Sequence, residues 1–159
     1  MTSIIVQTSI NAPIEICFDL ARDIGVHCQT SISTQERAIA GVTTGLIGLG
    51  EEVTFEGVHF GVRQRLTARV IEFDRPHRFV DEMLKGAFQS LRHIHEFSRV
   101  SSGTMMKDTL IWTSPLGLLG KLADKLFLEA HMRQFLLERN TLLKQIAEDV
   151  ANAEPPASC

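Results

Sequence analysis

The sequence predicts an α+β fold in which an antiparallel β-sheet of about seven strands packs against one long C-terminal α-helix. Apolar residues recur at intervals of three and four across residues 128–150, which is the spacing of one helix face. Residues 3–10 and most of residues 33–113 instead alternate apolar and polar side chains, which is typical of strands with one buried face. The order of one strand, one or two short helices, six strands and a long helix favours a sheet that grips the C-terminal helix.

Size and composition bound the class of protein. The chain has 159 residues, of which 44% are hydrophobic, so it can bury one real core. We expect a single domain over residues 1–150 and a disordered tail over residues 151–159. A net charge of −3 argues against a dedicated nucleic-acid surface. Three cysteines without paired spacing exclude a disulfide or zinc framework, and no motif indicates a cofactor.

The beginning of the chain predicts a half-buried strand followed by one or two short helices. Residues 3–10 place Ile4 and Ile10 on one side of a strand, and Pro13 then suits the first turn of a helix that buries Phe18. A second short helix or turn is expected between Asp23 and Thr30. No basic segment followed by an apolar run opens the sequence, so we expect a cytoplasmic protein without an integral membrane segment.

The middle of the chain predicts consecutive hairpins. The glycine-rich residues 41–50 form a loop whose Leu46, Ile47 and Leu49 are expected to tuck inward near a cavity entrance. Strands over residues 53–59 and 62–70 follow, with the arginines of the second strand facing solvent. A tight turn at Ser101-Ser102 would set Leu91, His93, His95 and Phe97 opposite Trp112, Leu110, Asp108 and Met106 on one sheet face.

The C-terminal helix carries one residue that does not fit its apolar stripe. Arg139 lies four residues after Phe135 and three before Leu142, near the centre of the buried face. A guanidinium there either extends to solvent, pairs with a core carboxylate such as Asp81 or Asp108, or anchors an anionic or carbonyl-bearing ligand. A second apolar stripe over residues 119–130 points the other way, which predicts a separate short helix or a kink near Phe127.

Seven short motifs resemble the START/Bet v 1-like superfamily, also called SRPBCC, in its polyketide cyclase/dehydrase and lipid-transport branch. They cover residues 4–148 and are Ala12-Pro13-Ile14-Glu15, Gly50-Glu51-Glu52-Val53-Thr54-Phe55 with His59-Phe60-Gly61, Arg78-Phe79-Val80-Asp81-Glu82, Gly86-Ala87-Phe88, His93-Ile94-His95-Glu96-Phe97, Thr104-Met105-Met106-Lys107-Asp108 and Pro115-Leu116-Gly117. The resemblance implies a helix-grip fold, with a curved sheet wrapped around the long helix and an elongated apolar cavity between them. It does not select one function, because this superfamily includes carriers, hormone-binding proteins and cyclases.

The first functional hypothesis is a cavity that holds a hydrophobic small molecule, lipid-like or polycyclic. This hypothesis rests on the predicted cavity lining, which is apolar with a few polar groups. The ligand-binding residues that we expect are Phe55, His59, Gln64, Leu66, Phe79, Asp81, Leu91, His93, Phe97, Met106, Trp112, Met132, Phe135 and Arg139.

The alternative hypothesis is an enzyme of the cyclase/aromatase or hydratase type. His95 is expected to pair with Asp108 across the hairpin, and the cyclase relatives imply the same pair as a catalytic acid and base. The sequence has no nucleophile motif and no tyrosine, which favours binding over catalysis. Imidazoles at His59, His93 and His95 would bind zinc only if all three met, so we expect no metal site. A third hypothesis is a module that contacts a protein partner through its exposed face.

Overall fold

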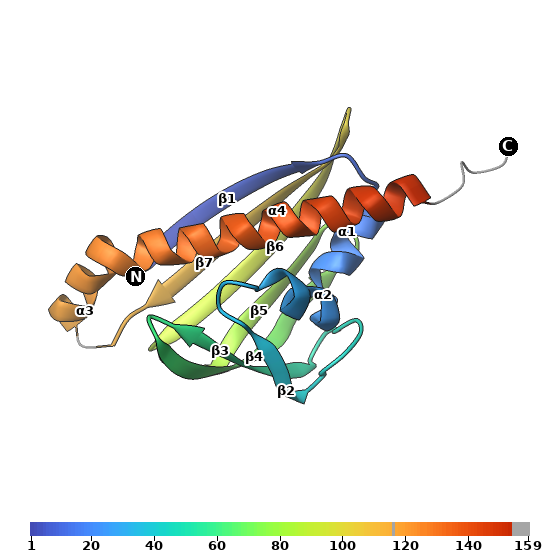
Figure 1. Ribbon diagram of the computed structural model, residues 1–159. Helices are drawn as coiled ribbons and strands as arrows, with labels where there is room; N and C mark the ends of the chain where they lie inside the picture. Colours follow the sequence, from blue (N-terminus) through green and yellow to red (C-terminus); the bar gives the residue numbers. More distant parts are fainter. Residues whose placement is uncertain (116, 154–159) are drawn as a thin grey trace, which may run out of the picture.

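The computed structural model describes residues 1–115 and 117–153, apart from four side chains between residues 118 and 124. Figure 1 shows the arrangement of the elements. In chain order they are β1 (Thr2–Ile10), α1 (Ile14–Ala21), α2 (Ile24–Thr30), β2 (Arg37–Gly41), β3 (Glu52–His59), β4 (Val62–Asp74), β5 (Arg78–Lys85), β6 (Ser90–Val100), β7 (Gly103–Thr113), α3 (Gly117–Ala123), the π-helical turn η1 (Asp124–Leu128) and α4 (Glu129–Ala153).

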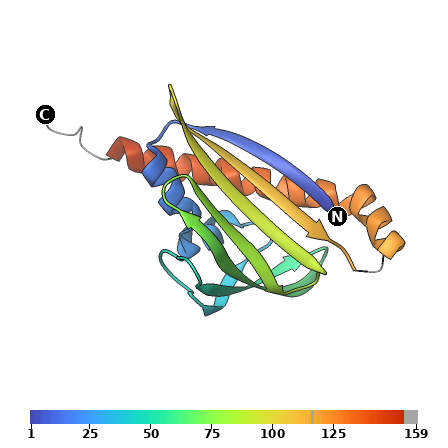
Figure 2. The ribbon, with the colours of Figure 1, turned by 180° about the vertical axis from the view of Figure 1, so that it is seen from behind.

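The described strands form one antiparallel seven-stranded sheet in the order β1-β7-β6-β5-β4-β3-β2. Six strands follow each other as hairpin neighbours, and β1 closes the series by pairing with β7. The sheet curves around α4, which lies across its concave face, and none of the described helices covers its other face (Figures 1 and 2). The predicted α+β fold with a sheet gripping the long helix is therefore confirmed.

The hairpin between β6 and β7 has the predicted register. Leu91 lies opposite Trp112, His95 opposite Asp108 and Phe97 opposite Met106. Successive side chains of a strand point to opposite faces, so this register places a histidine and a carboxylate together on the concave face. The register thus builds a polar group into an otherwise apolar wall.

The two short helices close one end of the concave face. The buried side of α1 consists of Ile14, Cys17, Phe18 and Ala21, as the sequence predicts. The ring of Phe18 meets three other phenylalanines of the core edge-on, at centroid distances of 5.4–5.5 Å. Asp23 caps α2 by accepting a hydrogen bond from the backbone nitrogen of Val26 at 3.1 Å. These contacts fix α2 beside the sheet.

The long helix buries a stripe that differs in part from the predicted one. Met132, Leu136 and Leu143 are buried as expected, but Phe135 is only partly buried and Val150 is 38% exposed. The predicted kink is present as η1, which separates the two stripes, and Leu122 and Leu126 of the first stripe face solvent. Helix α4 continues to Ala153, three residues beyond the predicted end of the domain, and the rest of the predicted tail, residues 154–159, lies outside the described residues.

The glycine-rich loop before β3 tucks inward at one residue instead of three. Ile47 is 5% exposed, whereas Leu46 and Leu49 are 47% and 62% exposed, so the prediction was wrong for these two leucines. Backbone hydrogen bonds from Ile24 to Gly45 and from Ile47 to Arg22 hold the loop against the start of α2. A segment anchored in this way can direct only one of its faces toward the core.

Candidate ligand-binding cavity

A cavity of about 330 Å³ lies between the concave face of the sheet, α2 and the first half of α4. It separates two apolar clusters, one built on β6, β7 and α4 around Trp112, and one built on α2, β3 and β4 around Phe55. Residues of both clusters line the space. Exposed Phe60 and Pro115 line it too, so the cavity reaches the surface at the end of the sheet beside the start of α4.

Most of the predicted ligand-binding residues line this cavity. They are Phe55, His59, Gln64, Leu66, Phe79, Asp81, Leu91, His93, Met132, Phe135 and Arg139, together with the predicted catalytic residue His95.

Phe97, Met106 and Trp112 do not line the cavity, which corrects their prediction as lining residues. Asp108, predicted as the catalytic partner of His95, does not line it either, but it contacts His95. Phe97 and Met106 lie under α1 and the end of α4, where they pack around Phe18. Trp112 is fully buried beneath the first half of α4. Alternation predicts the correct face of the sheet, but a face also contains the packed positions on either side of a cavity.

Asp108 is the centre of a buried charged group in the cavity wall. Its Oδ1 lies 3.0 Å from Nε2 of His93 and 2.8 Å from Nδ1 of His95, and its Oδ2 accepts a hydrogen bond from Asn140 on α4 at 2.7 Å. The contact with His95 is bent, so it is an ion-pair contact more than a directed hydrogen bond. Nε2 of His95 lies 3.2 Å from Asp81 Oδ2. The predicted pair of His95 and Asp108 is thus part of a group of four residues, Asp81, His93, His95 and Asp108, which we call the Asp108 group.

Burial and partners set the protonation of the Asp108 group. Burial alone would raise the pKa of Asp108, but His93 and His95 outweigh it and hold that pKa well below its usual value. Burial alone would lower the pKa of His95, but the contacts with Asp108 and Asp81 raise it instead. Burial and the neighbouring charge of His95 lower the pKa of His93. These directions favour a neutral His93, a more readily protonated His95 and ionised carboxylates at Asp81 and Asp108.

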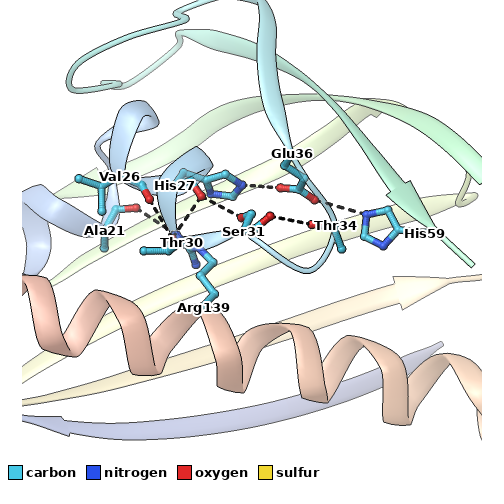
Figure 3. Close-up of polar contacts among 9 residues, drawn as sticks. All are labelled: Ala21, Val26, His27, Thr30, Ser31, Thr34, Glu36, His59 and Arg139. Carbon is cyan, nitrogen blue, oxygen red and sulfur yellow. Dashed lines mark hydrogen bonds and ion pairs between the residues drawn. The ribbon is translucent and has the colours of Figure 1, made fainter. Parts of the chain in front are cut away.

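A second polar group lies on the α2 side of the cavity. The carboxylate of Glu36, in the segment before β2, lies 2.7 Å from Nε2 of His27 and 3.3 Å from Nε2 of His59 (Figure 3). Nδ1 of His59 lies 3.1 Å from Nε2 of His131 on α4. Burial would raise the pKa of Glu36, but the two imidazoles outweigh it and lower that pKa. An ionised Glu36 therefore joins α2 and β3, and His59 continues this connection to His131 on α4.

Arg139 is 3% exposed and lines the cavity. Figure 3 shows its side chain extending from α4 toward Ala21, whose carbonyl oxygen accepts its hydrogen bond at 3.3 Å. Among the described residues it forms no ion pair with Asp81 or Asp108, and its Nε has no partner. The guanidinium therefore neither reaches solvent nor forms the predicted bond to a carboxylate, and a hydrogen-bond donor remains buried beside an open space.

Sequence reasoning did not identify Glu36, His27, His131 or Asn140 as site residues. A signal existed for Asn140, because Leu136, Asn140, Leu143 and Ala147 follow the 4-3-4 spacing of one helix face. No comparable pattern marks Glu36, which lies in a polar connection, or His131, which reaches the site because α4 begins beside the β3–β4 turn. Contacts between distant segments of this kind follow from the tertiary structure alone.

Comparisons with known proteins identify the fold. TTHA0849 from Thermus thermophilus is 19% identical, with a TM-score of 0.77 over 96% of this chain and 100% of that one. Major latex-like protein 151 from Panax ginseng is 12% identical, with a TM-score of 0.69 over 92% of this chain and 97% of that one. Ara h 8.0201 is 9% identical, with a TM-score of 0.66 over 93% and 98%. No family model and no curated protein matches the sequence. These similarities show that the chain has the Bet v 1-like helix-grip fold. They confirm the fold that the sequence motifs imply.

Proposed function

We propose that this chain, with its Bet v 1-like helix-grip fold, binds a hydrophobic small molecule in the cavity between the sheet and α4. The observation that carries the proposal is the cavity of about 330 Å³ that separates two of the apolar clusters of the core. Its volume lies at the lower end of the range of about 300–1,000 Å³ typical of small-molecule sites. An apolar ligand there would restore contacts that the separated clusters lack, at about 0.8 kcal/mol per buried methylene. Lipid-like chains and small polycyclic compounds fit this lining.

Arg139 favours a ligand with an acidic head group. Its buried guanidinium has one hydrogen bond, to a backbone carbonyl, and an unpartnered Nε among the described residues. A carboxylate on the ligand would supply both a countercharge and acceptors for these donors. Elsewhere the lining is mainly apolar. The arrangement therefore supports an amphipathic ligand whose carboxylate points toward α2 and whose apolar part lies under α4.

The test compares dodecanoic acid with its methyl ester, because the two ligands have the same apolar chain and differ in charge. Isothermal titration should give one acid per wild-type chain. Arg139→Met should weaken binding of the acid by about tenfold or more, since hydrogen bonds to charged groups contribute about 1.5–3 kcal/mol. The affinity for the ester should stay nearly unchanged. Native mass spectrometry of the purified protein would show any ligand retained from the host.

Arg133→Met is the matched control, because Arg133 is an exposed arginine on the same helix whose Nη1 donates to Ile5 outside the cavity. It should bind acid and ester like the wild type. If Arg139→Met lost affinity equally for the acid and the ester, Arg139 would support the fold and would not recognise the head group. Failure of every hydrophobic ligand to bind the wild type would refute the proposal.

A second candidate function is proton transfer on a bound carbonyl compound, of the kind carried out by cyclase/aromatase- or hydratase-type enzymes. The observation that favours it is the Asp108 group, because His93, His95 and Asp81 line the cavity. Both nitrogens of His95 contact carboxylates, whereas among the described residues His93 contacts a carboxylate, that of Asp108, only through Nε2. This favours His93 as the base and His95 as the charged partner, which refines the predicted pair of His95 and Asp108.

Screening against poly-β-keto thioesters would test the second candidate. An enzyme should lose turnover in both His93→Ala and His95→Ala while each variant still binds dodecanoic acid. A protein that only binds ligands should show no turnover in the wild type. Turnover that is equal in the wild type and both variants would remove these histidines from any reaction.

A further inference from the structure

We propose that Asp81, His93 and His95 form a binding site for a divalent transition-metal ion, such as zinc, in the wall of the cavity. One donor atom of each residue lies within 4.8 Å of a donor atom of the other two. Two imidazoles and one carboxylate are a donor set that such ions prefer. The site lies in the wall of the same cavity as the hydrophobic ligand, and it goes beyond the proposed function.

The sheet holds the three side chains rigidly. His93 and His95 alternate on β6, so both point to the concave face, and their ring centroids are 3.8 Å apart. Asp81 on the neighbouring strand β5 lies directly opposite His93 in the register. Ligands that come from adjacent paired strands move little relative to one another, which suits a metal site. His59 is not part of this set, because it pairs with Glu36 and His131.

Asp108 occupies the position of a carboxylate that orients metal-binding histidines. It contacts Nε2 of His93 and Nδ1 of His95, so the other nitrogens, Nδ1 of His93 and Nε2 of His95, would bind the ion, and Nε2 of His95 already lies 3.2 Å from the third ligand, Asp81. Histidines that bind metals usually donate their other N–H to such a carboxylate. Asn140 in turn fixes Asp108 through a hydrogen bond of 2.7 Å. The structure therefore has both the donor atoms and the outer contacts that hold them.

Charge and access agree with this assignment. Asp81 and Asp108 bring two negative charges into a buried wall. The ion would displace any proton on His95, and its two positive charges would balance the two carboxylates. All three proposed ligands line the cavity, so coordination positions not filled by the protein would face the open space. An oxygen of a bound molecule or of water could fill them, as in metal sites that keep an open position.

The experiment uses tag-free full-length protein treated with a chelator and then dialysed against zinc. Metal analysis should find one zinc per wild-type chain. Asp81→Asn and His93→Ala should each weaken zinc binding more than about 100-fold, because a lost ligand costs more than the 10- to 100-fold typical of an outer contact. His77→Ala is the control, since that imidazole lies in the β4–β5 turn and does not line the cavity; it should bind zinc like the wild type.

A second measurement replaces zinc with cobalt and records the visible absorption bands of the bound ion. Bands that require Asp81 and His93 would support the site independently of affinity, and circular dichroism would confirm that each variant is folded. Absence of stoichiometric zinc binding by the wild type would overturn the proposal. Unchanged binding by folded Asp81→Asn and His93→Ala would overturn it as well, because the zinc would then lie elsewhere.

Discussion

Replacing Asp108 with asparagine should destabilise the fold by about 3 kcal/mol at neutral pH. The carboxylate is fully buried, forms hydrogen bonds with His93 and Asn140, and makes an ion-pair contact with His95. The amide is nearly the same size, and Asn140 has an unpartnered Oδ1, among the described residues, that could accept its N–H. The same contacts could therefore form in the variant, but to a neutral amide in place of a charged carboxylate. Hydrogen bonds to charged groups exceed neutral ones by about 1 kcal/mol each, so the two hydrogen bonds, together with a similar loss from the ion-pair contact with His95, give about 3 kcal/mol.

Urea unfolding followed by circular dichroism measures this loss, and thermal unfolding should show a decrease of about 6–12 °C in Tm. Asp149→Asn, on the exposed side of α4, is the control and should change stability by less than about 0.5 kcal/mol. The pKa of His95 is raised in the folded state, so its contribution is complete below about pH 6.5 and is lost as the pH rises through its folded pKa. The cost of Asp108→Asn should therefore be larger at about pH 6 than at about pH 9. A loss below about 1 kcal/mol at neutral pH would refute this account of the Asp108 group.

Three further predictions concern packing, acid stability and a turn. Leu136→Ala should cost about 2–5 kcal/mol in urea unfolding, because Leu136 is 1% exposed, whereas Phe135→Ala should cost less because Phe135 borders the cavity; equal costs would mean that the cavity is filled by protein. The folded-state pKa of Glu36 lies below its usual value of 4.5, so its contribution is present above about pH 4.5 and is lost on acidification. Glu36→Gln should therefore be less stable than the wild type at neutral pH, with a gap that narrows toward acid pH, and a constant gap in urea midpoints would contradict this reasoning. Gly103→Ala should destabilise the β6–β7 hairpin, because the added Cβ would lie 2.3 Å from the Ile10 carbonyl oxygen at a φ of +136°; an unchanged Tm would contradict the observed turn geometry.

The sequence predicts the fold well because local patterns determine its main features. The alternation on β6 and β7, together with the Ser101-Ser102 turn, determines the register that brings His95 opposite Asp108. A change of hydrophobic direction near Phe127 predicts the break that the structure shows as η1. These inferences need only the period of each element and the residues that interrupt it.

The candidate site is predictable only in part, because a cavity depends on where elements separate and not only on which face they bury. Trp112 and Phe135 both belong to inward-facing stripes, yet Trp112 is packed under α4 while Phe135 borders the cavity. Glu36 meets His27 and His59 because a polar connection passes between α2 and β3. No periodicity encodes that passage. The exposure of the α3–η1 segment likewise emerges only from the structure. Among the described helices, none is long and apolar enough to cross a membrane.

The most direct test of the central claim is to fill the cavity and measure ligand binding. Ala68 on β4 is 5% exposed and lines the cavity, so the ring in Ala68→Phe would extend into the open space. The account predicts that calorimetric binding of dodecanoic acid falls at least about tenfold in Ala68→Phe, while Ala40→Phe, on the exposed side of β2, binds like the wild type. If the folded Ala68→Phe protein bound dodecanoic acid as tightly as the wild type, the ligand would lie outside the cavity and the claim would be wrong.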